Sequence, residues 1–365
     1  MQVDLFDRIY GCLIGGAIGD ALGAPVEGWN YWEIQAQYGK LETLIPSPRP
    51  NSNQLAGGVT DDTALRQYVA LAIIEKQGRI TPDDLAALWV KKGNSRLFWS
   101  NERTIYEKLS WGMNPWEAGK GANPCATASM AIAPVGVINA GDPWQAYQDG
   151  YLIASVNQDG EERDAAATMA AGVAAAFSPG AELDEVLAVM QRCTSFLMRR
   201  ALDLTMEIVE ASGSIAAFTE AYYRQMIDWR MPRPEYKIKP VADGYPRRAM
   251  YYSGSSYEII PVALAILRLC EGDVNSSLIE AANFGRDCDT IATIVGCLGG
   301  ALSGASAIRQ DWLETCEQAN RDLFEELEGD PQVNFYATAQ RLRSALLHEK
   351  KRAEERVRQL DDILG

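Results

Sequence analysis

The segment GCLIGGAIGDALG, residues 11–23, carries glycine at every fourth position, and GCLGGALSG, residues 296–304, repeats this spacing near the other end of the chain. The glycines in register are Gly11, Gly15, Gly19, Gly23, Gly296, Gly300 and Gly304. Glycine inside a helix costs about 0.5–1 kcal/mol relative to alanine, so the repetition needs a compensating role. A stripe of small residues lets two helix backbones approach closely. We therefore expect close helix packing here, which would bring the C-terminal end of the first helix near the start of the last core helix.

Helical periodicity also dominates the rest of the chain. Residues 61–76 place apolar side chains on one helix face, at Leu65, Tyr68, Val69, Ala72 and Ile73. The alanine-rich stretch 163–177 suits a buried helix. Further helices are expected at residues 184–196, 199–212, 257–270 and 275–283. Strand patterns are scarce, so the sequence predicts an all-α fold.

We expect residues 1–330 to form a single domain, because no composition shift divides them, and residues 331–365 to form a C-terminal charged helix. That helix suits packing or self-association into a homo-oligomer. Two long loops interrupt the helices, at residues 29–58 and 229–248. The second is basic and aromatic within an acidic chain. It fits either a surface connection or a lid over an anionic, ring-bearing substrate.

The chain is strongly acidic, with 34 basic and 49 acidic residues and a net charge of −15. A charge of this sign repels phosphate backbones and anionic lipids, so we expect neither nucleic acid nor a membrane as a partner. The seven cysteines have no CxxC spacing and suit reduced thiols. Asp4 and Asp7 lie where a signal peptide needs positive charge. These features predict a cytoplasmic protein.

The single histidine, His348, lies in the charged C-terminal segment. Histidine-based metal motifs and catalytic triads are therefore improbable. The chemistry of this chain must come from carboxylates, hydroxyls, lysine, tyrosine, cysteine or a bound metal.

Two clusters of acidic and hydroxyl side chains begin predicted helices. The first is the TDDT segment with Thr60, Asp61 and Asp62, and the second contains Asp287, Asp289 and Thr290. Either cluster alone is explained by helix capping, with Thr60 as a plausible N-cap. Together they offer the oxygen ligands that Mg²⁺ or Mn²⁺ prefers. Two divalent ions would neutralise four crowded carboxylates.

Glu27 follows the first glycine-striped helix, and it suits either an ordinary loop position or a further ligand or base. Two other acidic motifs are excluded by context. The DCDT segment has no apolar strand before it, as haloacid-dehalogenase phosphotransferases require. The third acid of a terpene-synthase DDxxD motif is missing, because Ala64 and Leu65 follow Thr63.

Four segments give the chain a resemblance to the ADP-ribosylglycohydrolase family. They are GCLIGGAIGDALGAPVE, TDDT, MAIAPVGV and GRDCDTIATIVGCLGGALSGA, in the family's order over residues 8 to about 310. The resemblance implies an orthogonal multi-helix bundle with a dinuclear Mg²⁺ or Mn²⁺ centre. It places Thr60, Asp61, Asp62 and Asp289 on one ion and Asp287, Asp289 and Thr290 on the other.

The resemblance further implies hydrolysis of the C1 bond of an ADP-ribosyl group or related riboside. Glu27 or Asp62 would act as the catalytic base, with Glu27 alternatively a ligand or gate. Glu102, Asn123 and Asn157 are the expected substrate contacts. The expected partner is an ADP-ribosylated protein or a small ribosylated molecule.

Three departures from the family pattern fall on substrate contacts. Asn157 stands where many members have a histidine, the glycine-rich loop around Asn123 is spaced differently, and Arg286 occupies a usually small position. An alternative is therefore a catalytically silent relative that keeps the fold for structure or ligand binding. A third, a dinuclear phosphohydrolase, lacks a convincing nucleophile motif.

Overall fold

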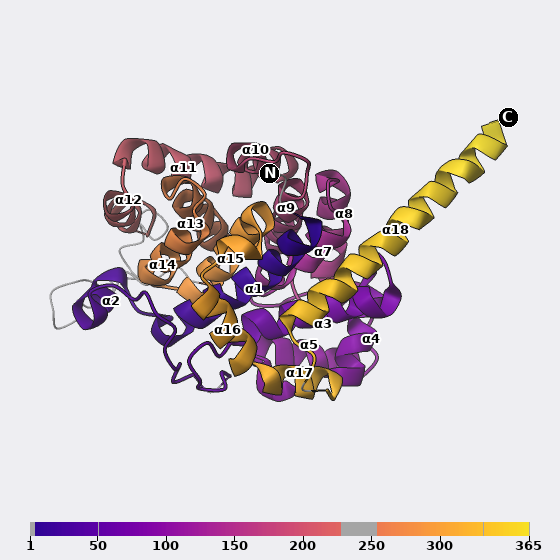
Figure 1. Cartoon of the computed structure of the whole chain (residues 1–365), viewed down its shortest axis with the longest axis horizontal. Coiled ribbons are helices and arrows are strands. Elements are labelled where there is room, and N and C mark those ends of the chain that lie inside the picture. Colours follow the sequence, from indigo (N-terminus) through magenta and orange to yellow (C-terminus); the bar gives the residue numbers. More distant parts are fainter. Residues whose placement is uncertain (1–3, 50, 228–253, 331, 365) are drawn as a thin grey trace.

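The structure, a computed structural model, describes residues 4–49, 51–227, 254–330 and 332–364. Within these ranges the chain forms α-helices joined by turns and short helical segments, and no β-strand (Figure 1). Two isolated β-bridges, Asn30 with Gly285 and Pro46 with Ala56, are the described extended pairings. The predicted all-α fold is confirmed.

The helices of the first half are α1 Leu5–Gly23, α2 Tyr31–Tyr38, α3 Asp61–Lys76, α4 Pro82–Lys92, α5 Ser100–Ser110, α6 Thr127–Ala131, α7 Ala133–Ile138, α8 Pro143–Ile153 and α9 Gly160–Ala176. Those of the second half are α10 Leu183–Cys193, α11 Phe196–Ser212, α12 Ile215–Tyr222, α13 Ser256–Leu269, α14 Val274–Phe284, α15 Cys288–Ser303, α16 Gln310–Ala319, α17 Arg321–Glu328 and α18 Phe335–Leu364.

Helices α1 and α15 lie antiparallel in the middle of the bundle, joined along their glycine stripes (Figure 1). A Cβ atom placed on Gly15 would lie 2.5 Å from the carbonyl oxygen of Gly296, and one on Gly19 would lie 2.1 Å from that of Ala292. At the end of the stripe, a Cβ on Gly23 would lie 2.3 Å from Cα of Asp289. The predicted packing is confirmed, and it sets the end of α1 against the start of α15.

The predicted helices are present, with ends that shift by a few residues. Residues 61–76 form α3 as predicted, and the alanine-rich stretch forms the buried helix α9. The expectation of an unstructured loop over residues 29–58 is wrong in part, because α2 forms there. Its start is stabilised by a capping box in which the backbone N–H of Asn30 donates to Glu33 Oε2 at 2.8 Å. The predicted loop at residues 229–248 lies outside the described residues.

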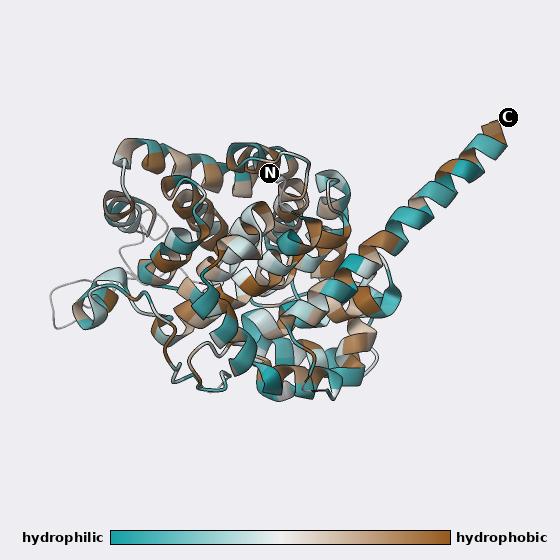
Figure 2. Cartoon of the chain, in the orientation of Figure 1, coloured by the Kyte–Doolittle hydropathy of each residue, from teal (hydrophilic) through white to brown (hydrophobic). Residues whose placement is uncertain are grey.

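Helix α18 begins in the core and ends in solvent. Phe335, Ala339, Leu342 and Ala345 are fully buried among the other helices. Beyond this buried stretch the helix projects from the body, largely polar with apolar turns near its tip (Figures 1 and 2). The exposed apolar side chains there include Val357, Leu360, Ile363 and Leu364. Self-association through this segment, and its division from residues 1–330 as a separate unit, remain predictions.

Among the described residues, one segment, Leu5–Val26, is long and apolar enough to cross a membrane, but 94% of its most apolar window is buried inside the protein. Its composition is that of a central bundle helix, because α1 is surrounded by other helices on nearly every side.

Candidate metal centre and active-site pocket

Asp20, in the last turns of α1, holds the N-terminus of α3. Its carboxylate accepts from the backbone N–H of Thr60 at 3.0 Å and of Thr63 at 3.1 Å, and from the Thr60 hydroxyl at 2.9 Å. Thr60 occupies the N-cap position, but its side chain makes no capping bond within α3. Thr60 is therefore the N-cap residue as predicted, but the hydrogen bonds that satisfy the free N–H groups of Thr60 and Thr63 come from Asp20. Asp61 and Asp62 are not needed as caps and are left for other roles.

The start of α15 is tied to the turn that carries Glu27. The backbone N–H of Arg286 donates to the carbonyl of Trp29 at 2.5 Å, and the N–H of Gly28 donates to the carbonyl of Arg286 at 2.6 Å. Gly285 has φ of +79°, and a Cβ atom there would lie 2.5 Å from the Trp29 carbonyl oxygen, so only glycine fits. These contacts place Glu27 beside the carboxylates of α15.

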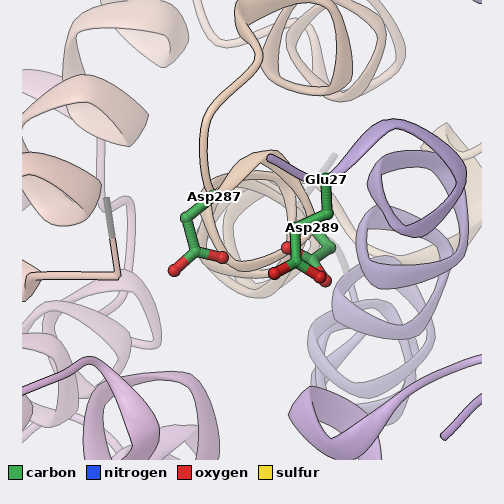
Figure 3. Close-up of side chains that lie close together, drawn as sticks. All are labelled: Glu27, Asp287 and Asp289. Atoms are coloured by element: carbon green, nitrogen blue, oxygen red, sulfur yellow. The ribbon is translucent and has the colours of Figure 1, made fainter. Parts of the chain in front are cut away.

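Glu27, Asp287 and Asp289 form a compact group of carboxylates (Figure 3). Each offers an oxygen, and these oxygens all lie within 4.8 Å of one another. Asp287 is held by the Thr290 hydroxyl, which donates to its Oδ1 at 2.9 Å. A divalent cation fits such a group, because it takes several carboxylate oxygens at short range.

A pocket of about 190 Å³ opens over this group. It is lined by Glu27, Arg49, Asp61, Asp62, Trp99, Ser100, Asn101, Glu102, Asn123, Cys125, Ala126, Thr127, Met130, Gly254, Asp287, Asp289 and Thr290. Two of the predicted site residues are absent from this lining. Thr60 is buried against Asp20, and Asn157 is buried at the end of the short helix Ala154–Val156.

Arg49 is the one basic side chain in the described lining of the pocket, so its six carboxylates are hard to ionise together. Burial, followed by the charges of Glu102, Asp289 and Asp20, raises the pKa of Asp61 to about 8. Burial and the charge of Asp289 raise the pKa of Asp62 and of Asp287 well above the usual range. The Oδ1 atom of Asp62 is buried and has no hydrogen-bond partner in the part of the chain that the structure describes. An oxygen-only set with an orphaned, buried carboxylate oxygen suits a hard divalent cation.

This crowding predicts how the metal-free protein responds to pH. The folded-state pKa of Asp61 is raised to about 8, far above its value in an unfolded chain, so the folded state binds more protons between about pH 4 and pH 8. The free energy of unfolding should therefore fall as pH rises through this window. We expect urea melts in a chelator to show this decline. Saturating Mn²⁺ should abolish or reverse it, because the ion binds the deprotonated carboxylates. A pH-independent melt without metal would contradict the prediction.

The far wall of the pocket is built around Glu102. Its side chain is buried, and Oε1 accepts from the Thr127 hydroxyl at 2.9 Å. Its Oε2 atom has no partner among the described residues and is buried. Asn123 lies nearby on an exposed turn, where its backbone N–H donates to Asn101 Oδ1 at 3.3 Å. Of the three predicted substrate contacts, the structure thus brings Glu102 and Asn123 to the pocket and leaves Asn157 outside its lining.

Three residues in or next to the site were given no role by the sequence analysis. Asp20 caps α3, Arg49 pairs with Glu27, and the half-exposed Trp99 lies at the pocket's edge. Asp20 could have been recognised in the sequence, because it is the one charged residue in the apolar segment 11–23 and a buried charge requires a polar partner. Arg49 and Trp99 have none, since both come from irregular segments.

Arg286, next to the candidate metal ligands at the start of α15, forms an ion pair with Glu258 from α13. Arg286 is 6% and Glu258 0% exposed, and Nη2 of Arg286 donates to Oε2 of Glu258 at 3.0 Å. We expect Arg286→Ala to lower the free energy of unfolding by about 3–5 kcal/mol, because it removes the guanidinium that balances the charge of a fully buried carboxylate. Urea unfolding followed by circular dichroism would measure this loss. The double variant Arg286→Leu with Glu258→Leu should lose much less free energy of unfolding than Arg286→Ala. Equal losses in the two variants would rule out the ion pair as the cause.

Comparisons with known proteins show which family the chain resembles. The sequence model of a family described as ADP-ribosylglycohydrolase matches residues 1–349. An uncharacterized protein of Archaeoglobus fulgidus is 28% identical over 324 residues, covering 88% of this chain and 94% of its own. The mouse ADP-ribosylhydrolase ARH3 is 23% identical over 348 residues, covering 85% and 87%. A solved structure titled ADP-ribosylglycohydrolase-related protein complex has a TM-score of 0.64 at 20% identity, covering 94% of this chain and 98% of that one. This last likeness concerns the fold.

Proposed function

The chain belongs to the ADP-ribosylglycohydrolase family of glycosidic-bond hydrolases, and from this premise we propose that it uses two divalent cations to hydrolyse the C1 bond of an ADP-ribosyl group or a closely related riboside. The observation that carries the proposal is the pocket itself. It gathers carboxylates from the turn after α1, the start of α3 and the start of α15.

The donor set fits a pair of Mg²⁺ or Mn²⁺ ions. Asp61, Asp62 and Asp289 would hold one ion, and Asp287, Asp289 and Thr290 the other, with Glu27 at its side. Thr60 would join the first ion through the lone pairs of its hydroxyl oxygen, whose hydrogen is donated to Asp20. Bound there, the ions would orient the ribose diol and lower the pKa of a water molecule.

The chain's own residues supply the remaining chemistry. Cleavage of a glycosidic bond passes through an oxocarbenium-like state, which the carboxylates of the pocket stabilise by their charge. Asp62 or Glu27 would take the proton of the attacking water. Burial and the neighbouring carboxylates raise the pKa of Asp62, which makes its ionised carboxylate a stronger proton acceptor. Glu102 and Asn123 would contact the substrate, and Asn157 receives no contact in this proposal.

The partner would be an ADP-ribosylated protein or a small ribosylated molecule. The charge of −15 disfavours nucleic acid and anionic membranes as partners. We propose a cytoplasmic location, since the cysteines suit a reducing compartment, and self-association through the projecting part of α18.

The test is release of free ADP-ribose, followed by chromatography, from peptides ADP-ribosylated on serine or arginine and from small ribosides. Hydrolysis should require Mg²⁺ or Mn²⁺ and stop in a chelator. Binding of ADP-ribose without hydrolysis of any substrate would favour the silent relative, and release of inorganic phosphate would favour a phosphohydrolase.

A further inference from the structure

We propose that Arg49 is a built-in counter-cation of the metal centre, holding Glu27 in the metal-free protein and giving it up when a divalent ion binds. This inference rests on the metal centre of the proposed function. It concerns a positioning residue, because Arg49 acts through Glu27.

The contact that carries the inference joins the Arg49 guanidinium to the Glu27 carboxylate. Both side chains are 21% exposed, so the pair lies at the edge of the pocket rather than free in solvent. Glu27 is also one of the three carboxylates whose oxygens lie within 4.8 Å of one another. The Arg49 charge therefore compensates the same group of carboxylates that suits a divalent ion.

Arg49 is the one positively charged side chain in the described lining of the pocket. Among the lining residues that the structure describes, the other charged side chains are all acidic: Glu27, Asp61, Asp62, Glu102, Asp287 and Asp289. Two divalent ions would supply the positive charge that this set lacks. A guanidinium and a metal ion compete for the same carboxylate, because each needs its oxygen lone pairs and each repels the other.

The backbone around Arg49 is fixed to the helix turn that precedes Glu27. The Ser47 hydroxyl is buried, donates to the carbonyl of Ala24 at 3.2 Å and accepts from the backbone N–H of Arg49 at 3.3 Å. The carbonyl of Arg49 accepts from the N–H of Ser52 at 3.2 Å. With its backbone held at both ends, Arg49 approaches Glu27 by rotation of its side chain alone. Release therefore needs a change of rotamer and no refolding of the segment.

Asn51, two residues further on, provides an internal comparison. Its Nδ2 donates to Oδ1 of Asp61 at 2.6 Å, so it also contacts a predicted metal ligand. The amide is neutral and does not repel an incoming cation. We therefore expect the positively charged Arg49 to compete with a metal ion for its carboxylate, and the neutral Asn51 to compete only weakly.

The experiment is calorimetric titration of Mn²⁺ into chelator-stripped, full-length protein. We expect Arg49→Ala and Arg49→Gln to bind Mn²⁺ more tightly, on the order of fivefold, because the ion no longer displaces a paired cation. Arg49→Lys should bind Mn²⁺ with an affinity close to that of the unaltered protein, because the positive charge is kept. Asn51→Ala and Arg200→Ala, which removes an exposed arginine of α11, should change affinity little. Arg49→Gln keeps a long polar side chain, so its Mn²⁺ affinity can still be measured if the alanine variant folds poorly.

Unchanged or weaker Mn²⁺ binding by both neutral variants would overturn the inference, because Arg49 would then support Glu27 as a ligand or simply anchor its segment. Absence of Mn²⁺ binding in every protein would overturn it as well. The proposed function is judged separately by release of ADP-ribose, so a protein that shows the affinity change but hydrolyses no riboside refutes the function alone.

Discussion

Asp289→Asn should lower the rate of ADP-ribose release by a factor on the order of a thousand or more, the largest loss we expect from one substitution. Asp289 is the carboxylate that both proposed ions share, and it is 2% exposed at the start of α15. Asparagine keeps its shape but removes the charge and one ligand oxygen. The measurement is single-turnover hydrolysis at saturating Mn²⁺, beside calorimetric titration of the ion.

The same substitution should stabilise the metal-free protein. The charge of Asp289 contributes to the raised pKa values of Asp20, Asp62 and Asp287, so its removal relieves repulsion in the folded state. In a chelator at pH 7, Asp289→Asn should therefore melt at a higher temperature than the unaltered protein. Asp362→Asn, on the exposed end of α18, should leave both activity and melting unchanged. An active Asp289→Asn variant would refute the shared-ligand role.

Gly296→Ala should lower the free energy of unfolding by about 3 kcal/mol, the largest structural effect we expect from adding one methyl group. The added Cβ would lie 2.0 Å from the carbonyl oxygen of Gly15, and the next nearest atoms also belong to the backbone of α1. No side chain can move aside, so the helices must separate. Urea unfolding followed by circular dichroism measures the loss.

Gly299→Ala is the matched control, because it adds the same methyl group to the same helix. Its Cβ would meet Val274 Cγ2 at 3.0 Å and Leu267 Cδ2 at 3.6 Å, which are side-chain atoms that can shift. Alanine also favours the helix by about 1 kcal/mol over glycine. The control should therefore be close to neutral. Similar losses at both positions would contradict the backbone contact as the cause.

Much of the fold was predictable because close helix packing leaves a spacing in the sequence. The stripe from Gly11 to Gly23 can only serve a neighbour that approaches the backbone, and a second stripe at Gly296 and Gly300 supplied that neighbour. The periodicity of residues 61–76 likewise predicted the helix α3, although the structure buries every residue from Asp62 to Ile74 and not one face alone. Helix α2 was missed because its residues carry little apolar periodicity and its start depends on the capping box of Asn30 and Glu33.

The candidate site was predictable only in part. The acidic pairs at α3 and α15 are visible as unusual charge in an already acidic chain, and the structure brings both pairs to one pocket. The partners of these carboxylates were not visible. Arg49 reaches Glu27 because Ser47 fastens its segment to Ala24, a contact that no local pattern encodes. Asn157 failed to reach the pocket lining for the same reason, since its location depends on the path of the preceding helix.

The direct backbone contact between α1 and α15 makes one part of the molecule far less tolerant of amino-acid substitution than another. The proposed metal ligands at the ends of these helices depend on an interface where even one added carbon is too large. The rim of the pocket, with Trp99 and Asn123, lies on irregular segments where side chains can be exchanged without moving that interface. A lineage with this architecture is therefore expected to acquire new leaving-group preferences by altering the rim, while the hydrolytic centre is inherited unaltered.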